Sequence, residues 1–232
     1  MHIICLNVWK GRMFKELSTF IHNNPADIYC FQEVLSCSSK INHEGMQLNL
    51  LQKLQDLLPN HQAHFVPAVQ CDVGGHNIEY GIAMFTRVKM ETFSVLIHHD
   101  TKPGLKNQTK HVQWGFVGNV MVAHFHGLWT GGDKNDCEQR RLQSKKINKI
   151  LTDTCVLMGD FNYDIDIEPL QILELNKINL IKKYNIKTTR SKQYTGTWKY
   201  ADYCIVTPNV TVQEFYVDPT ECSDHLALRL KI

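Results

Sequence analysis

The chain has 232 residues, enough for one domain with a substantial hydrophobic core but too few for two large ones. We therefore expect residues 1–232 to form a single domain. Hydrophobic residues make up 43% and charged residues 21%, the balance of an ordinary globular protein. The formal net charge is only +2, which excludes a protein that coats nucleic acid through charge alone but allows an anionic substrate in a local patch.

The cysteines and the N-terminal segment bear on the compartment. None of the 8 cysteines forms a C-x-x-C pair, and several lie in apolar runs where cysteine acts as a small hydrophobe, so we expect reduced thiols. The segment MHIICLNVWKGR lacks the features of a signal peptide, and no stretch is long enough to span a membrane. These observations predict a cytoplasmic monomer, and leave open secretion by a route without a cleaved signal.

The hydrophobic pattern predicts the elements in chain order. The first half is expected to form a strand, a helix, a strand, a helix and four strands: Ile3–Val8, Phe14–Ile21, Asp27–Val34, Met46–Leu58, His64–Val69, Gly81–Arg87, Glu91–Ile97 and Trp114–His126. The second half is expected to form a helix, a strand, a helix and three strands: Asp136–Leu151, Thr154–Asp160, Pro169–Asn176, Ala201–Thr207, Thr211–Val217 and Leu226–Ile232.

Helices interrupt these strands without alternating strictly with them. Several strands follow one another directly, which favours mixed or antiparallel sheets packed face to face over a barrel of regular βα units. We therefore predict an α/β (α+β) fold, specifically a four-layer α/β/β/α sandwich of two sheets flanked by helices. The long polar stretches between the elements, such as Gln70–Glu79 and Lys187–Lys199, are expected to be loops that carry specificity.

Polar residues that suit metal and proton chemistry stand at the ends of the predicted strands. They are Asn7, Glu33, His126, Asp160, Asn162, Asp202, Asp224 and His225. Carboxylate and amide oxygens suit Mg²⁺ or Mn²⁺, and histidines oriented by carboxylates suit proton transfer or phosphate contact. Any one of these residues alone is more often a turn residue or a solvated strand end, so the prediction depends on the whole set in its order.

The short sequence segments that contain these residues resemble the motifs of a known family. The segments are Leu6-Asn7-Val8-Trp9, Phe31-Gln32-Glu33-Val34, residues 81–87 (GIAMFTR), His126-Gly127-Leu128, Gly159-Asp160-Phe161-Asn162, Ala201-Asp202-Tyr203 and Ser223-Asp224-His225. In this order, from near the first residue to near the last, they resemble the motif series of the endonuclease/exonuclease/phosphatase superfamily. The resemblance implies the fold predicted above and a phosphoesterase that depends on Mg²⁺ or Mn²⁺.

The resemblance also implies roles for individual residues. Glu33 would be the main metal ligand, with Asn7 beside it and Asp224 near the metal. Asp160 would orient or deprotonate the attacking water, and Asn162 would hold that water or a phosphoryl oxygen.

The histidines complete this set. His225 would contact the scissile phosphate, with Asp202 fixing its tautomer. His126 would act on the leaving-group side, and Glu79 is the candidate to orient it. How acid and base duties divide among Asp160, His126 and His225 stays open.

Two departures from the family pattern affect this assignment. Many relatives have Asn-x-His on the middle strand, where this chain has His124-Phe125-His126. We choose His126 because Gly-Leu follows it, which leaves the role of His124 open. The first motif ends in Trp9-Lys10-Gly11, which differs from the sequence of the nuclease branches and so does not assign the chain to a named subfamily.

Basic and aromatic residues alternate in two loops that are candidates for substrate contact. One contains Lys187, Arg190, Tyr194, Lys192, Trp198 and Lys199, and the other contains Lys102, Lys106, Lys110 and Trp114. From these we select Tyr194 and Trp198 for substrate binding. Arg140 is added as a third candidate, although bracing a loop is its commoner role in such a place.

Three functions remain in view. The first is hydrolysis of phosphodiester bonds in DNA, RNA or a nucleotide. The second is hydrolysis of a phosphoinositide or another small phosphorylated molecule. The third is a catalytically silent binding module, which the presence of every motif residue disfavours.

Overall fold

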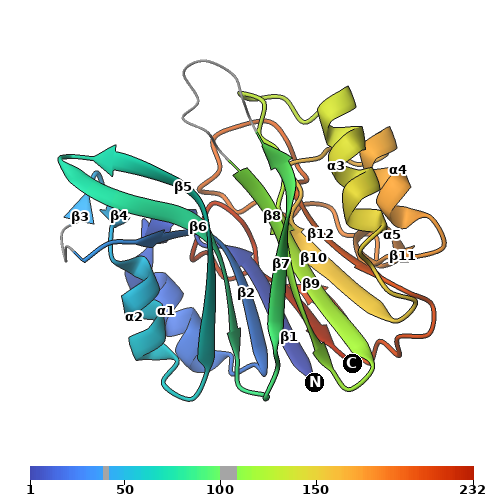
Figure 1. Ribbon diagram of the computed structural model, residues 1–232, viewed down its shortest axis with the longest axis horizontal. Helices are drawn as coiled ribbons and strands as arrows, with labels where there is room; N and C mark the ends of the chain where they lie inside the picture. The colour runs from blue at the N-terminus through green and yellow to red at the C-terminus, as the bar shows by residue number, and fades with distance from the viewer. Residues whose placement is uncertain (39–41, 100–108) are drawn as a thin grey trace.

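The computed structural model describes residues 1–38, 42–99 and 109–232, so the basic residues Lys102 and Lys106 lie outside the described part of the chain. Two six-stranded sheets pack face to face at the centre of the molecule (Figure 1). In spatial order, the first sheet consists of β13 (Glu214–Val217), β14 (Leu228–Lys231), β1 (His2–Asn7), β2 (Ile28–Ser36), β6 (His76–Thr86) and β5 (Gln62–Val73). The second consists of β11 (Ile178–Asn179), β12 (Asp202–Val206), β10 (Cys155–Asp160), β9 (Val120–His126), β8 (Thr109–Val117) and β7 (Thr92–His99).

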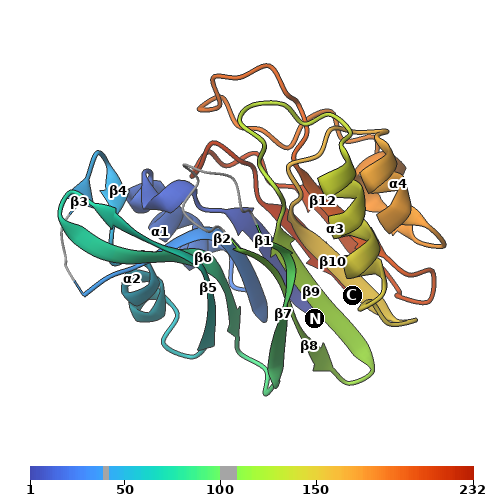
Figure 2. The ribbon, with the colours of Figure 1, turned by 45° about the horizontal axis from the view of Figure 1, so that its top comes forward.

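Helices cover the outer face of each sheet, as both views show (Figures 1 and 2). The first sheet is covered by α1 (Phe14–Asn23) and α2 (Leu50–Leu57), and the second by α3 (Glu138–Asn148) and α4 (Glu168–Glu174). The remaining short elements are a 3₁₀ turn at Trp9–Gly11, β3 (Asn42–His43), β4 (Met46–Gln47) and α5 (Leu180–Lys183). The predicted four-layer α/β/β/α sandwich is confirmed. No helix in the described part is both long and apolar enough to cross a membrane.

The alternation of side chains along β1 explains how this packing brings a polar residue to the centre. Ile4 and Leu6 pack with the helices of the first sheet, whereas Ile3 and Cys5 pack in the cluster shared with the second sheet. Asn7 follows with the same period of two, so its side chain also faces the second sheet. β1 packs against helices on one face and against the second sheet on the other, so both of its faces are buried. The strand is therefore apolar from Ile3 to Leu6 and becomes polar only at its last residue.

Both sheets are mixed, and their parallel pairs determine where the motif residues meet. β1 runs parallel to β2 with Asn7 opposite Gln32, and β10 runs parallel to β9 with Asp160 opposite His126. Parallel neighbours end at the same edge of a sheet. Asn7, His126 and Asp160, which end their strands, and Glu33, which follows Gln32 on β2, are therefore gathered at one end of the sandwich.

Several predicted boundaries are wrong for identifiable local reasons. The strand predicted over Trp114–His126 is a hairpin of β8 and β9, because Gly118 adopts a φ of +60° at the turn. The predicted helix Met46–Leu58 begins only at Leu50, because Met46 and Gln47 pair with Asn42 and His43. The stretch Gln70–Glu79, expected to be a loop, instead extends the β5–β6 hairpin around Gly74 and Gly75.

Candidate active site

A β-bulge directs Glu33 toward the polar end of the sandwich. The pairing of β2 with β6 is regular up to Gln32 and shifts by one residue before Val34, leaving Glu33 without a partner at a φ of +59°. A bulge of this kind re-aims one side chain out of the normal alternation. Glu33 Oε2 lies 2.6 Å from Lys10 Nζ, and Asn7 Nδ2 donates to Glu33 Oε1 at 3.3 Å. Burial disfavours the Glu33 charge, but the Lys10 ammonium outweighs it and lowers the pKa to about 2.

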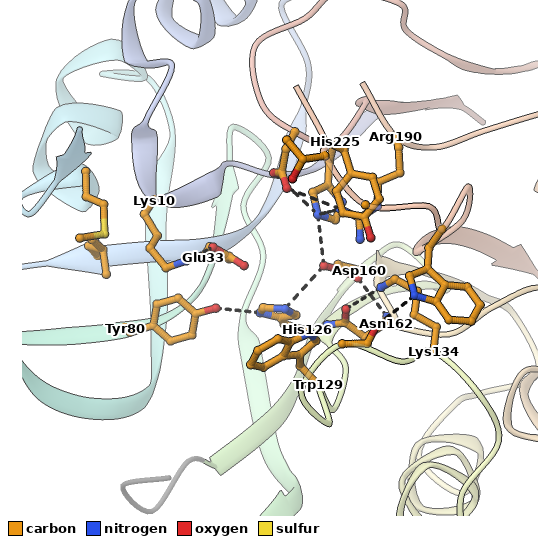
Figure 3. Close-up of a pocket in the computed structure, with 18 of the residues that line it drawn as sticks. Lys10, Glu33, Tyr80, His126, Trp129, Lys134, Asp160, Asn162, Arg190 and His225 are labelled. Atoms are coloured by element: carbon orange, nitrogen blue, oxygen red, sulfur yellow. Dashed lines mark hydrogen bonds and ion pairs between the residues drawn. The ribbon is translucent and has the colours of Figure 1, made fainter. Parts of the chain in front are cut away.

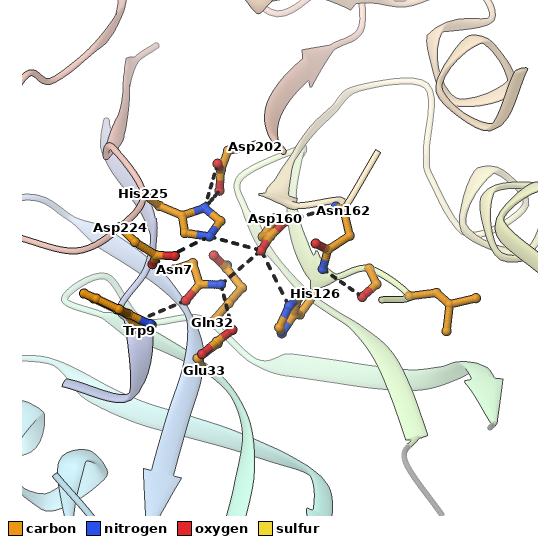
Figure 4. A network of polar contacts seen from close by, with 12 residues as sticks. Asn7, Trp9, Gln32, Glu33, His126, Asp160, Asn162, Asp202, Asp224 and His225 are labelled. Carbon is orange, nitrogen blue, oxygen red and sulfur yellow. Dashed lines mark hydrogen bonds and ion pairs between the residues drawn. The ribbon is translucent and has the colours of Figure 1, made fainter. Parts of the chain in front are cut away.

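Asp160 is the centre of the polar network (Figure 4). Its Oδ2 accepts a hydrogen bond from Asn7 Nδ2 at 3.0 Å and lies 3.6 Å from the Nε2 atoms of both His126 and His225. Its Oδ1 accepts from the backbone N–H of Asn162 at 2.9 Å. Burial acts against ionisation, but the positive potential of His225, His126 and Lys134 holds the pKa well below its usual range. Asp160 is thus an ionised hydrogen-bond acceptor that is almost fully shielded from solvent.

His225 is held at both of its ring nitrogens, by Asp202 on the side away from Asp160 and by Arg190 on the side that faces it. Its Nδ1 lies 2.8 and 2.9 Å from the two carboxylate oxygens of Asp202, while Arg190 Nη1 contacts its Nε2. Burial lowers the pKa of His225, but Asp202 outweighs it, so the net direction is upward. Asp202 therefore sits where it was expected, fixing Nδ1 as the protonated nitrogen and leaving Nε2 to face the cavity.

Tyr80, rather than Glu79, contacts His126. The Tyr80 hydroxyl lies 3.3 Å from His126 Nδ1, whereas Glu79 accepts from the Gln70 amide on the exposed side of the β5–β6 hairpin. The prediction that Glu79 orients His126 is wrong, because neighbouring residues of a strand point to opposite faces. Burial lowers the pKa of His126 to about 3, so the imidazole is neutral at pH 7.

His124 lies two residues deeper on the same face and makes no contact with the cavity. Gln32 Nε2 donates to its Nδ1 at 3.1 Å, and its Nε2 lies 2.9 Å from Gln113 Oε1. It is fully buried, and burial lowers its pKa to about 3. His124 is thus a neutral bridge between the two sheets, and His126 is the histidine that reaches the polar end.

Asn162 links the Asp160 strand to the polar stretch Thr130–Asn135, which the sequence predicts to be a specificity loop but in which it does not single out Lys134. Its Oδ1 accepts from Lys134 Nζ at 2.8 Å, and its Nδ2 donates to the carbonyl of Gly127 at 3.3 Å. Gly127 has no Cβ, which allows its backbone to lie against Phe161, where a Cβ would be 1.9 Å from the Phe161 carbonyl oxygen. Lys134 sits in a polar stretch, and no sequence signal distinguishes it from a solvated lysine.

A cavity of about 800 Å³ opens over this network (Figure 3). Its cationic lining residues are Lys10, Lys110, Lys134 and Arg190, and its aromatic ones are Tyr80, Trp129, Tyr194 and Trp198. One wall is aliphatic and consists of Leu35, Met46, Val69, Val73 and Ile78 together with Cys71. Tyr194 and Trp198, which were predicted to contact substrate, both line this cavity.

Arg140 does not reach this cavity, and its predicted contact with substrate is wrong. Its side chain is 0% exposed and donates to Thr130 Oγ1, to Asp133 Oδ1 and to the carbonyls of Asp133 and Asn135. A guanidinium that is enclosed in this way holds a loop in shape. Arg140 braces residues 130–135, the loop that carries Lys134.

The donor set at this end of the sandwich fits a hard divalent cation. Asp224 has a pKa raised by burial and, after the opposing effect of His225, by the negative charge of Glu33 and of Asp160, so these carboxylates repel one another. A cation between Glu33 and Asp224 would relieve that repulsion.

Two other sets of potential ligands are less suited to bind this divalent cation. Asp160, Asp202 and His225 also come close enough to share an ion, but the Asp202 oxygens already contact His225 Nδ1. Asn7 Oδ1 accepts from the Trp9 N–H, so Asn7 turns its amide nitrogen to Glu33 and Asp160 and acts as a positioning residue.

Comparisons with known proteins show the family to which the chain belongs. The model of the "Endonuclease/Exonuclease/phosphatase family" matches residues 4–225. The structure of a family member from Beutenbergia cavernae has a TM-score of 0.77 at 14% identity, over 99% of this chain and 70% of that one. The mannosyl-6-phosphatase Bt3783 of Bacteroides thetaiotaomicron has a TM-score of 0.68 at 15% identity, over 100% and 98%.

The human nocturnin catalytic domain with bound sulfate has a TM-score of 0.65 at 19% identity, over 99% of this chain and 93% of that one. At these identities the solved structures show the shared fold. No curated protein matches the sequence. The family model spans nearly the whole chain, including every motif that meets at the cavity, and the chain belongs to the endonuclease/exonuclease/phosphatase family.

Proposed function

We propose that this protein is a divalent-metal-dependent phosphodiesterase that acts on a nucleotide or on the end of a nucleic acid. The observation that carries the proposal is the buried, ionised Asp160, which lies within 3.6 Å of both His126 Nε2 and His225 Nε2 at the floor of a cationic cavity. A buried carboxylate between two imidazoles is suited to hold a water molecule and to accept its proton.

The other groups of the network divide the remaining tasks. Asp160 would orient the attacking water, helped by Asn162, whose backbone N–H fixes the carboxylate at 2.9 Å. His225 would offer Nε2 to the phosphoryl group while Asp202 holds its Nδ1. His126 would face the departing oxygen, with Nδ1 held by the Tyr80 hydroxyl. The water oxygen bonds to phosphorus as the ester P–O bond breaks. The proton of the water passes to Asp160, and the departing oxygen takes up a proton from His126 Nε2.

Glu33 and Asp224 would hold the metal ion. Such an ion supplies Lewis-acid stabilisation of the phosphoryl oxygens. Lys10 lies 2.6 Å from Glu33 and neutralises it, so an incoming ion competes with this ammonium group. Asn7 fixes the relative positions of the Glu33 and Asp160 side chains, which come from different sheets, because its amide nitrogen donates to both.

The cavity supports a compact substrate. About 800 Å³ is the size of a site for a nucleotide-sized ligand, and the exposed Trp129 together with Tyr194 and Trp198 offers aromatic faces to a base. The aliphatic wall from Leu35 to Ile78 favours a second candidate, a small phosphorylated molecule with an apolar group. One structural neighbour, the mannosyl-6-phosphatase, acts on a small phosphorylated compound.

The test is hydrolysis with Mg²⁺ or Mn²⁺ across single- and double-stranded DNA, RNA, dinucleotides, inositol phosphates and sugar phosphates. We expect Asp160→Asn to lower kcat by about 10³-fold, within the range that positioned acid–base groups contribute. Asp153→Asn, at an exposed position, is the matched control and should retain full activity.

The pattern of substrates then decides between the candidates. A dinucleotide or a nucleic-acid end cleaved best would support the first candidate, and a sugar or inositol phosphate cleaved best would support the second. Equal turnover by Asp160→Asn and Asp153→Asn would contradict the mechanism. Metal binding without hydrolysis of any substrate would favour a binding module.

A further inference from the structure

The buried ammonium group of Lys134 lies beside the catalytic network and makes no ion pair with any carboxylate of the described residues. Its residue is 3% exposed, and its one hydrogen-bond partner among the described residues is the neutral Asn162 Oδ1, at 2.8 Å. An ammonium has three N–H donors, and a buried charge with unfilled donors is costly. The negative potential of Asp160 favours the charge, but burial outweighs it and lowers the pKa to about 8.

Arg190 brings a second cation to the same part of the cavity. It reaches the cavity from the loop of Tyr194, whose ring lies 4.1 Å below its guanidinium carbon. Nη1 contacts His225 and lies 3.8 Å from Asp224 Oδ2, while the buried Nε has no hydrogen-bond partner among the described residues. The charge of Arg190 also disfavours protonation of Lys134, so the two cations repel each other.

The fold holds both cations in place against this repulsion. Arg140 braces the loop on either side of Lys134 through Asp133 and Asn135. Trp198 Nε1 donates to the carbonyl of Gly132 at 2.9 Å and so ties this loop to the loop that carries Arg190. Figure 3 places Lys134 and Asn162 on the opposite side of Asp160 from Lys10 and Glu33.

We infer that Lys134 and Arg190 form an anion-binding subsite that holds the non-bridging oxygens of the substrate phosphoryl group, opposite the Glu33 side of the site. The inference rests on the proposed function for the identity of the anion. Charge-assisted hydrogen bonds to phosphate oxygens would fill the unused donors of both side chains and relieve their repulsion. Lys134 would touch the reacting group and is thus a further catalytic residue.

Binding of inorganic phosphate tests this subsite without turnover. Calorimetry in the presence of a chelator would compare the wild type with Lys134→Met, which removes the charge, and Lys134→Gln, which removes the charge but can still donate to Asn162. We expect both substitutions to raise the Kd for phosphate by about 10-fold or more, the value of one charge-assisted hydrogen bond. Lys146→Met is the matched control, because Lys146 is exposed on α3 and does not line the cavity, and it should bind phosphate like the wild type.

Three results would overturn the inference. The first is phosphate binding by both Lys134 variants at the strength of Lys146→Met. The second is weakened phosphate binding in Lys134→Met but not in Lys134→Gln. That result would show that the hydrogen bond to Asn162, and not the charge of Lys134, supports phosphate binding. The third is loss of the folded state in both variants, because a buried charge without an anionic partner is not expected to be required for folding.

Hydrolysis gives a separate readout. With the best substrate of the panel, Lys134→Gln should lower kcat by on the order of 10²-fold, as removal of one preorganised donor does. If no substrate is hydrolysed but phosphate binding depends on Lys134, the subsite stands and the proposed function fails. If hydrolysis occurs without dependence on Lys134, the proposed function stands and the subsite fails.

Discussion

Four of the eight non-glycine residues with a positive φ in the described part of the chain lie around the candidate active site. Trp9, Lys10, Glu33 and Asn162 have φ values of +47°, +55°, +59° and +56°, a region that glycine adopts freely, asparagine tolerates and other residues rarely occupy. Each such residue costs on the order of 1–3 kcal/mol and persists only where its surroundings impose it. At Glu33 and Asn162 the strained conformation turns a polar side chain toward Asp160 or its neighbours, which is consistent with a functional role.

The two histidines of β9 should respond in opposite ways to the same substitution. His124→Gln removes a neutral bridge between Gln32 and Gln113, and we expect it to lower the free energy of unfolding by about 1–3 kcal/mol while activity is retained. His126→Gln should leave the stability nearly unchanged and lower kcat by about 10²-fold or more. Urea unfolding and steady-state kinetics of both variants check this. Loss of activity in His124→Gln alone would reverse the assignment.

At the scale of elements, the last two strands anchor the loop that leads to His225. Asp218 directly follows β13, and its Oδ1 accepts from the Thr220 N–H at 3.0 Å while its Oδ2 lies 3.0 Å from Arg229 Nη1 on β14. Burial raises the pKa of Asp218, but the Thr220 hydrogen bonds and Arg229 outweigh it and lower the pKa below its usual value. The start of the Asp224 and His225 segment is thus fixed by an ionised carboxylate.

Asp218→Asn should therefore destabilise the protein in a pH-dependent way. A carboxyl group with a lowered pKa in the folded state contributes stability above its unfolded pKa of about 3.9, and this is lost as the pH falls through the lower folded value. We expect the variant to be less stable by about 1–2 kcal/mol at pH 7, and this difference to shrink below about pH 4. Urea unfolding at pH 7, 5 and 3 measures it. A constant difference across this range would contradict the ionic origin, and Asp153→Asn is the control.

At the scale of the whole molecule, the site exists only because two sheets meet. Glu33 and Asn7 come from the first sheet, and Asp160, His126 and Asp202 come from the second. Asn7 spans the interface by donating to Glu33 and to Asp160. A cation bound beside Glu33 would therefore add stability to the assembled sandwich and not to either sheet alone.

Mg²⁺ or Mn²⁺ should accordingly raise the melting temperature. At a concentration 100-fold above Kd, a ligand of the folded state adds about 2.7 kcal/mol, or roughly 5–11 °C for a protein of this size. Chelation should reverse the shift and abolish hydrolysis. Glu33→Gln should lose most of the shift, whereas Glu16→Gln, at an exposed position on α1, should keep it. An equal shift in both variants would exclude Glu33 as a ligand.

The sequence by itself determined the layers and most of the site residues. Apolar runs that end in Asn7, His126 and Asp160 predict buried strands with polar ends, because a polar residue escapes burial only where the strand leaves the core. The order of the motifs predicted the family. These features depend on local pattern and on residue identity, which a sequence states directly.

Only the tertiary structure decided which neighbours act on these residues. The bulge at Glu33 changes the face on which side chains emerge, and the alternation along β6 brings Tyr80 rather than Glu79 to His126. Lys134 and Arg190 lie 56 positions apart in the numbering and meet only because their loops close over the same cavity. Long-range pairing, strand register and burial set these contacts, and none of the three is written in the local pattern of the chain.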